Sequence, residues 1–269
     1  MCQLLGLSFN QEINPGIPFR VLMSRSLAHP DGWGLAAYPD ESGSAVVFKE
    51  PIPGYDSQLA QFLCSYRELK SKIFIGHIRR ATRGDIKLDN THPFARCYAG
   101  REFTFCHNGT LSKRHSLKQV SYQPVGDTDS ERVFCFLLSQ LRRYKIIPTR
   151  LGDSWAYTDW GLQVIHEILL DINAKTAGIF NCLFSDGQYL FAYRDLKEAR
   201  NLFYKKCQNL SEKTEAPENM ISQNLSIENH RRNYGYVVAT EPLDDEGWHS
   251  FAGGNLMVFK DGNMVANLH

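Results

Sequence analysis

The chain has 269 residues, of which 43% are hydrophobic and 12% aromatic. This composition can bury a sizeable core, so it excludes a disordered or fibrous protein. The 30 basic residues nearly balance the 29 acidic ones, leaving a net charge of +1. Because nucleic acids and anionic membranes bind concentrated basic surfaces, we expect no nucleic-acid or membrane partner and favour a small molecule.

Two further absences narrow the class of protein. The longest uninterrupted apolar run, Val133 to Leu138, has six residues, whereas a membrane-spanning helix needs about 20. No apolar stretch precedes a cleavage site near the N-terminus, so we expect no secretion signal. The seven cysteines are an odd number without a CxxC pair. These features favour a reduced, cytoplasmic protein in which thiols such as Cys135 and Cys182 are buried as small hydrophobic side chains.

The first half of the chain is predicted to be mainly sheet. Short apolar or alternating segments bounded by Gly, Pro and Asp predict strands at residues 4–9, 34–38, 45–48, 72–79 and 101–107. Between them, helical spacing of apolar side chains predicts a covering helix over residues 57–69, at Leu59, Phe62, Leu63 and Tyr66.

Helices and then hairpins are predicted to follow. The sequence Thr128-Asp-Ser-Glu131 has the form of a capping box, in which Thr128 caps a helix over about 129–144 and Glu131 bonds back to the cap's amide. A third helix is expected over about 159–173. Asp-Gly turns at 186–187 and 261–262 predict two hairpins. Strands followed by helices and strands indicate an α+β fold with mostly antiparallel sheet.

Cys2 has a chemical possibility that the other cysteines lack. Removal of Met1 would leave Cys2 with both a thiol and a free α-amine, whose pKa of about 7.7–8.0 makes part of it an unprotonated base at neutral pH. One residue could then supply both nucleophile and base. Position alone favours an incidental buried side chain, so the hypothesis depends on further motifs.

Polar motifs follow several of the predicted strands. They are His29-Pro-Asp-Gly-Trp-Gly34, Gly76-His-Ile-Arg-Arg-Ala-Thr-Arg-Gly84, Thr91-His-Pro-Phe94, His107-Asn-Gly-Thr-Leu111 and Gly126-Asp-Thr-Asp-Ser-Glu131. Asn108-Gly109 could supply an amide and a backbone N–H to an oxyanion, or could simply form a turn. Arg79 could clamp a carboxylate or make a surface ion pair. Asp129 could bind a ligand or only complement the helix dipole.

Taken together with Cys2, these motifs resemble the class II glutamine amidotransferases, the N-terminal-nucleophile glutaminase domains. The resemblance implies a single domain over residues 1–269, folded as a four-layer αββα sandwich. The stretch at about 205–233 is polar and without a regular pattern, and we interpret it as a surface excursion rather than a domain linker. The resemblance also implies roles for individual residues. Cys2 is the nucleophile, Asn108 and the Gly109 amide hold the oxyanion, Arg79 binds the substrate α-carboxylate, Asp129 binds its α-ammonium, and Thr82 lines the glutamine site.

The expected reaction is hydrolysis of the γ-amide of glutamine or of a γ-glutamyl compound through a Cys2 thioester, without a cofactor or metal. A separate synthase subunit is a possible partner for released ammonia. The alternative is a non-catalytic glutamine-binding or regulatory subunit. Arg80 and Arg83 depart from the Trp and His of many two-domain members, whereas Asp31 and Gly32 are assigned structural roles beside Cys2. The motif histidines, His77 and His107 among them, show no short metal-ligand spacing and are expected to be structural.

Overall fold

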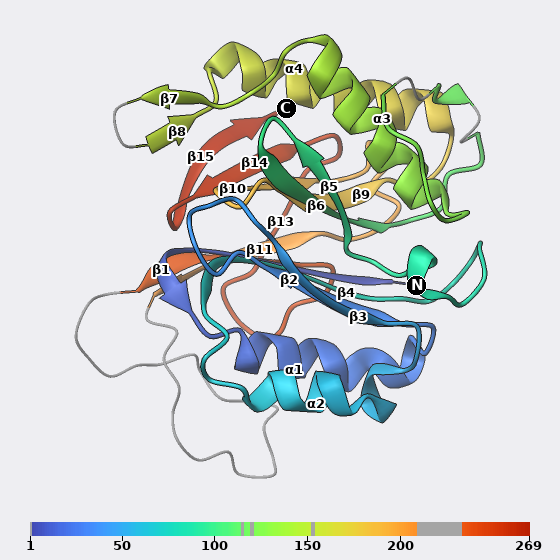
Figure 1. The fold of residues 1–269 in the computed structure, drawn as a ribbon, viewed down its shortest axis with the longest axis vertical. Helices are drawn as coiled ribbons and strands as arrows, with labels where there is room; N and C mark the ends of the chain where they lie inside the picture. The colour runs from blue at the N-terminus through green and yellow to red at the C-terminus, as the bar shows by residue number, and fades with distance from the viewer. Residues whose placement is uncertain (1, 114–115, 119–120, 152–153, 209–232) are drawn as a thin grey trace.

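The computed structural model describes residues 2–113, 116–118, 121–151, 154–208 and 233–269. Two antiparallel sheets lie face to face, and a pair of helices covers the outer face of each one (Figure 1). The α+β class and the four-layer αββα order are therefore confirmed.

One sheet has seven strands and contains the N-terminal strand at its centre. Its order is β13 (His249–Ser250), β11 (Phe203–Gln208), β12 (Tyr234–Ala239), β1 (Gln3–Ile13), β4 (Ser71–Ile78), β2 (Trp33–Ala37) and β3 (Val46–Glu50). Its outer face is covered by α1 (Gly16–Ser24) and α2 (Gln58–Ser65). We call this the seven-stranded sheet.

The second sheet has six strands. Its order is β15 (Asn263–Leu268), β14 (Leu256–Lys260), β10 (Tyr189–Tyr193), β9 (Asn181–Ser185), β6 (Arg101–Asn108) and β5 (Phe94–Tyr98). The covering helices are α3 (Asp129–Arg143) and α4 (Asp159–Thr176), and a small ribbon of β7 (Thr149–Leu151) and β8 (Ser154–Ala156) lies beside them.

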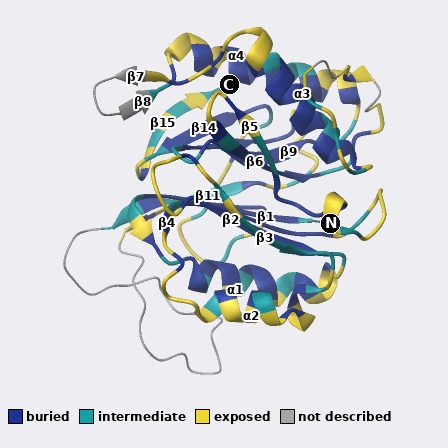
Figure 2. Ribbon diagram, in the orientation of Figure 1, coloured by how far each residue is buried: buried dark blue, intermediate teal, exposed yellow. Residues whose placement is uncertain are grey.

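Three hydrophobic clusters fill the three spaces between the four layers. One joins the six-stranded sheet to α3 and α4, and another joins the seven-stranded sheet to α1 and α2. The third lies between the sheets and includes Leu4, Ile75, Cys106, Leu183 and Leu190. Strands therefore carry buried side chains on both faces, while the helices expose their outer sides (Figure 2). This double burial explains why the central strands have nearly continuous apolar sequences.

The predicted strands, three predicted helices and both hairpins are confirmed with shifts of a few residues at their ends. The prediction missed α1, because Gly16 and Pro18 favour a loop. Pro18 is tolerated because it lies in the first helical turn, where its missing N–H has no intrahelical acceptor. The first helical bond follows directly, with the Phe19 amide donating to the Pro15 carbonyl at 2.8 Å.

The predicted excursion at 205–233 needs a partial correction. Its first four residues belong to β11, which pairs with β12 and contains the buried Cys207. Residues 209–232 lie outside the described residues. The polar sequence of this strand hid it, because β11 is near the sheet edge, has the adjacent lysines Lys205 and Lys206, and buries only Cys207.

The start of α3 also differs in one detail from the predicted capping box. Thr128 caps the helix as expected, with its hydroxyl oxygen accepting from the Glu131 amide at 3.2 Å. The Glu131 carboxylate, however, accepts from the amides of Val125 at 3.0 Å and Gly126 at 2.7 Å, and pairs with Arg96. Glu131 therefore fixes the loop that leads into α3 rather than the amide of its cap.

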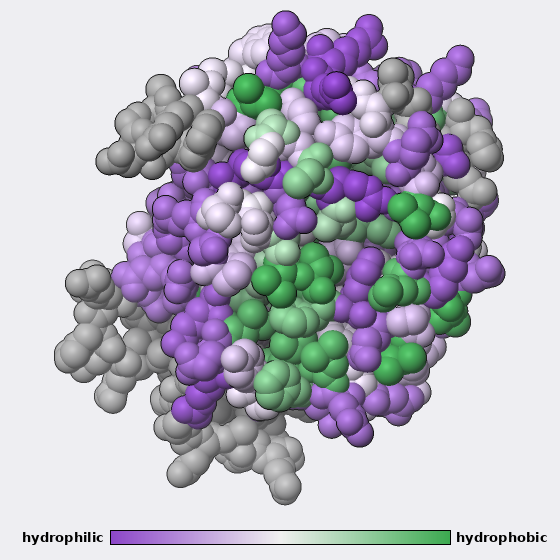
Figure 3. All heavy atoms as spheres, in the orientation of Figure 1, coloured by the Kyte–Doolittle hydropathy of each residue, from purple (hydrophilic) through white to green (hydrophobic). Residues whose placement is uncertain are grey.

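Hydrophobic side chains gather on the lower half of the face in Figure 3, where the seven-stranded sheet and its helices lie. Exposed apolar residues on these elements and their loops include Val46, Ile52, Tyr55 and Phe62. Among the helices that the structure describes, none has the length and apolar character of a membrane span.

Candidate active site around Cys2

Cys2 directly precedes β1, and sheet pairing fixes its neighbours. Gln3 lies opposite Ile78 in the β1–β4 register, so Cys2 lies beside the residues that follow β4. The Arg80 amide donates to the Cys2 sulfur at 3.4 Å, and the thiol lies 3.5 Å from the Arg80 carbonyl oxygen. Burial raises the pKa of the Cys2 thiol, and the Arg80 amide offsets part of this effect. The thiol is therefore protonated at neutral pH and needs a base before it can attack.

A cavity of about 150 Å³ brings Cys2 together with Asn108. Asn108 ends β6 of the six-stranded sheet, so each sheet contributes one strand end to the same cavity. Among the described residues, no hydrogen bond holds the Asn108 side chain. Its amide is therefore available to a bound molecule.

Gly109 lies where only glycine fits. A Cβ atom at this position would lie 1.9 Å from the Ile179 carbonyl oxygen and 2.7 Å from His107 Nε2. The same carbonyl accepts a hydrogen bond from His107 Nε2 at 3.0 Å, while His107 Nδ1 accepts from the Ser130 hydroxyl at 2.8 Å. These bonds make His107 the structural imidazole predicted for it. They also hold the Asn108-Gly109 backbone against the segment of the same chain that contains Ile179.

Arg79 is buried at the end of β4 and is heavily hydrogen-bonded. Its two terminal nitrogens donate to backbone carbonyls at 3.1 to 3.5 Å, namely those of Asp31, Arg83, Gly84 and Asp85. Its charge lowers the pKa of the Cys2 thiol, although less than burial raises it. The structure therefore places a guanidinium near the thiol, with its terminal nitrogens directed to the turn at residues 83–85.

Thr82 and Asp129 attach neighbouring loops to this region. The Thr82 hydroxyl lies 2.7 Å from the Thr110 hydroxyl, which connects the segment after β4 to the one after β6. Asp129 is buried at the start of α3 and accepts from the Leu111 amide at 2.6 Å and from the Ser130 amide at 3.1 Å. Its charge raises the pKa of the Cys2 thiol, opposite to the effect of Arg79. The loop that contains Thr82 and the start of α3 are thus both bonded to the residues that directly follow Asn108 and Gly109.

Comparison with known proteins agrees with this arrangement. A family model described as "Glutamine amidotransferases class-II" matches residues 1–269. The chain belongs to this family. It is 42% identical over 265 residues to "Uncharacterized protein MJ1515" of Methanocaldococcus jannaschii, covering 98% of this chain and 71% of that protein. It is 39% identical over 197 residues to "Putative glutamine amidotransferase YafJ" of Escherichia coli, covering 72% of each chain.

Solved structures support the same fold. A crystal structure described as a predicted glutamine amidotransferase from Pseudomonas aeruginosa superposes with a TM-score of 0.65 at 29% identity, covering 98% of this chain and all of that one. The glutamine phosphoribosylpyrophosphate amidotransferase of Bacillus subtilis gives a TM-score of 0.62 at 17% identity, covering all of this chain and 49% of that one. This second likeness supports the fold alone.

Asp31 and Gly32, to which structural roles beside Cys2 were assigned, bond to the backbone of the segment after β4. The Asp31 carboxylate accepts from the Ala81 amide at 2.7 Å, and the Gly32 carbonyl accepts from the Arg79 amide at 2.7 Å. Gly32 has a φ of +130°, which favours glycine. Asp31 and Gly32 thus fix the segment whose Arg80 amide contacts the thiol.

The cavity beside Cys2 is also lined by residues that the sequence analysis did not single out. They are Gln3, Ala199, Arg200, Asn201, Thr240 and Glu241. Gln3 had a usable signal, since it is a polar residue next to Cys2 at the start of an apolar strand. The other five belong to no motif and come from segments about 200 residues further along the chain. Arg79, Thr82 and Asp129 do not line this cavity.

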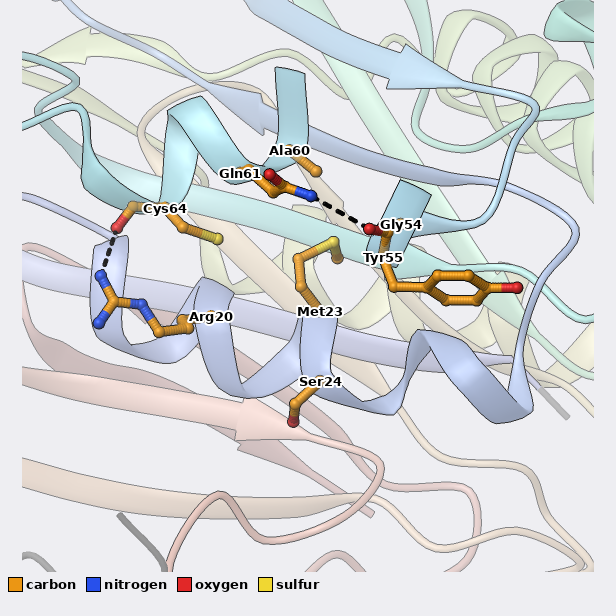
Figure 4. A pocket seen from close by; sticks show the side chains of 8 residues that line it. All are labelled: Arg20, Met23, Ser24, Gly54, Tyr55, Ala60, Gln61 and Cys64. Carbon is orange, nitrogen blue, oxygen red and sulfur yellow. Dashed lines mark hydrogen bonds between the residues drawn. The ribbon is translucent and has the colours of Figure 1, made fainter. Parts of the chain in front are cut away.

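A larger cavity of about 330 Å³ lies elsewhere, between α1, α2 and the segment before α2 (Figure 4). Hydrogen bonds within its wall join Gln61 to the Tyr55 carbonyl and Arg20 to the Cys64 carbonyl. It contains none of the predicted site residues, so size alone does not identify the site. Within the described residues, no group of three or more His, Cys, Asp or Glu side chains is placed to hold a metal ion.

Proposed function

We propose that this amidotransferase hydrolyses the γ-amide of glutamine or of a γ-glutamyl compound through a thioester on Cys2. The observation that carries the proposal is the shared cavity of Cys2 and Asn108, which come from different sheets. A thiol beside an unbonded carboxamide and the closely packed Gly109 has the equipment for acyl transfer, which needs a nucleophile and preorganised oxyanion donors.

In the proposed reaction, removal of Met1 frees the Cys2 amine, which accepts the thiol proton through a water molecule. Sulfur then bonds to the γ-carbonyl carbon, and the negative charge on oxygen is held by the Asn108 side chain and the Gly109 amide. When this intermediate collapses, the carbon–nitrogen bond breaks and the leaving nitrogen takes the proton. Water then attacks the thioester, releasing glutamate and restoring the thiol.

The glutamyl end of the substrate is assigned to the charged residues near the thiol. Arg79 would bind the α-carboxylate, Asp129 the α-ammonium, and Thr82 would line the space between them. Because both terminal nitrogens of Arg79 already donate to carbonyls, the turn at 83–85 has to give up some of these bonds when a carboxylate enters. If the substrate is free glutamine, a separate synthase subunit would receive the ammonia.

The deciding experiment combines mass spectrometry of the N-terminus with turnover of glutamine and γ-glutamyl amides. We expect the active protein to begin at Cys2, and both Cys2→Ala and an N-terminal extension that blocks Met1 removal to abolish turnover. Cys97→Ala, which alters an exposed free thiol, is the matched control and should retain activity. Turnover by the blocked form would refute the amine as base. Glutamine binding without turnover in the protein that begins at Cys2 would instead indicate a regulatory subunit.

A further inference from the structure

The cavity beside Cys2 has a second half that the proposed glutamyl-binding residues do not reach. Besides Cys2 and Asn108, its lining includes residues 199–201 and 240–241, which we call the far half of the cavity. Arg79, Thr82 and Asp129, to which the glutamyl end is assigned, are absent from its lining. When the γ-amide of a substrate lies at Cys2 and its glutamyl end is bound by these residues, the part of the substrate still without a binding site is the group on the amide nitrogen. The far half of the cavity therefore faces the leaving amine.

The size of the cavity limits what that amine can be. Pockets for drug-sized ligands hold about 300 Å³ or more, whereas this one measures about 150 Å³. A group of the size of one amino acid fits this volume. Ammonia alone would leave most of it unused.

The charges that line the cavity differ in how they are partnered. Arg200 is half-buried, and its guanidinium donates to the Ala199 carbonyl at 3.1 Å. No carboxylate among the described residues lies within ion-pair distance of it. Arg200 therefore lines the same cavity as Cys2 and has no counter-ion in the part of the chain that the structure describes.

The anion of the same cavity is already partnered. Glu241 accepts from Gln3 Nε2 at 2.7 Å, and its other oxygen lies 4.0 Å from Arg25 Nε. Gln3 is held in turn by the Thr240 hydroxyl, which donates to its Oε1 at 2.6 Å. Because Glu241 is engaged and partly exposed while Arg200 lacks a counter-ion, the cavity favours a negatively charged group near Arg200.

We propose that this is a leaving-group subsite in which Arg200 selects amines that carry a carboxylate. The substrate class is then a γ-glutamyl amino acid or short γ-glutamyl peptide. A guanidinium suits this task because its planar fork can donate two parallel hydrogen bonds to a carboxylate. The bond between the γ-carbonyl carbon and the amide nitrogen breaks, the nitrogen takes the proton that the thiol gave up, and a free amino acid or peptide leaves. Water then cleaves the thioester to glutamate. This inference rests on the proposed function.

The test compares two substrates that differ only at the leaving group. γ-Glutamylglycine carries a carboxylate at the position expected to meet Arg200, and γ-glutamyl methylamide does not. We expect the wild-type protein to favour γ-glutamylglycine in kcat/KM, and Arg200→Ala to lower the ratio of the two kcat/KM values about tenfold, as for one partly exposed charged hydrogen bond. Lys197→Ala, which removes an exposed cation from the same loop outside the cavity, should leave the ratio unchanged.

The outcomes separate the two proposals. If wild-type protein turns over both substrates but Arg200→Ala leaves their ratio unaltered, the subsite is wrong while the proposed function stands. An equal fall in both rates would indicate a general structural role for Arg200 and would also overturn the subsite. If the protein that begins at Cys2 hydrolyses neither substrate nor glutamine, the proposed function fails and this inference fails with it. Arg200→Lys adds a check, since a point charge should restore the ratio only in part.

Discussion

At the scale of single residues, Arg79 and Asn108 lie near the same thiol but differ in whether their side-chain hydrogen-bonding groups already have partners. Arg79 uses both terminal nitrogens on backbone carbonyls, so it holds a turn as well as a charge. The Asn108 amide lies on the Cys2 cavity with no hydrogen bond among the described residues. A guanidinium can bind an anion that is already present in the substrate, here by exchanging some backbone carbonyls for a carboxylate. A free amide can stabilise negative charge that develops only during the reaction.

This difference predicts opposite kinetic effects. Arg79→Lys should mainly raise KM, because a lysine cannot make the two-pronged contact with an α-carboxylate. Asn108→Ala should mainly lower kcat, by about 10²- to 10³-fold, because it removes one oxyanion donor. Steady-state kinetics with glutamine measure both effects. A reversed result, in which Arg79→Lys changes only kcat and Asn108→Ala only KM, would show that the two roles are misassigned.

At the scale of elements, the loop before α3 depends on one buried carboxylate. Glu131 is 2% exposed, accepts from the amides of Val125 and Gly126, and pairs with Arg96 of β5. Because α3 begins at Asp129, the same contacts position the proposed ammonium-binding carboxylate. The start of α3 and the loop before it thus share the Glu131 carboxylate, which joins them to Arg96 of β5.

We therefore predict that Glu131→Ala lowers the free energy of unfolding by about 3 kcal/mol, since it leaves Arg96 and two loop amides without their acceptor. It should also raise KM for glutamine, because Asp129 loses its support. Urea unfolding and steady-state kinetics measure these two effects. Arg143→Ala, an exposed change in the last turn of the same helix, should cost less than about 0.5 kcal/mol. Equal stability of the two variants would contradict the assigned role of Glu131.

The same scale shows what the sequence could predict. Many strands buried on both faces and the Thr128 cap have strong local signals, so most strands of the two sheets and α3 could be predicted, whereas β5, β11, β12 and β13 were not. The helix α1 could not, because Gly16 and Pro18 are poor helix formers whose cost is offset only by packing in the folded chain. In the site, Cys2 and Asn108 were found through motifs. Arg200 was not, because only the folding of a distant segment brings it to the lining of the Cys2 cavity.

At the scale of the whole molecule, hydrogen bonds as well as hydrophobic packing join the two sheets. His77 of β4 donates through Nε2 to the His107 carbonyl of β6 at 3.2 Å. The Tyr38 hydroxyl, just after β2, lies 2.9 Å from the Ser185 carbonyl oxygen of β9. These bonds fix the sheets relative to each other, and Cys2 and Asn108 lie on opposite sides of that same junction. The geometry of the cavity therefore depends on the integrity of the layer between the sheets.

Three buried histidines make this layer sensitive to acid. Burial lowers the pKa of His77 to about 3 and lowers the pKa values of His92 and His107 below the ordinary value of 6.5. The protonated form of each is thus disfavoured in the folded protein, whereas on unfolding each histidine returns to its ordinary pKa and binds protons more readily. Because the unfolded state then binds more protons, the free energy of unfolding falls as pH falls below about 6.5. Each histidine contributes a limiting slope of about 1.4 kcal/mol per pH unit.

We predict that His92→Phe makes the free energy of unfolding fall less steeply as the pH is lowered below about 6.5. The change in slope should equal roughly the contribution of one histidine. His92 is a suitable choice because neither of its ring nitrogens has a hydrogen-bond partner among the described residues, and its ring packs against His77 at 4.2 Å and Phe94 at 4.5 Å between centroids. A phenyl ring preserves this packing and cannot take a proton. Urea unfolding at pH 7.5, 6 and 5 gives the slope, with the exposed His249→Gln as the control. If His92→Phe and the wild type lose stability in parallel from pH 6 to pH 5, then the buried imidazole of His92 does not contribute to the acid sensitivity of this layer.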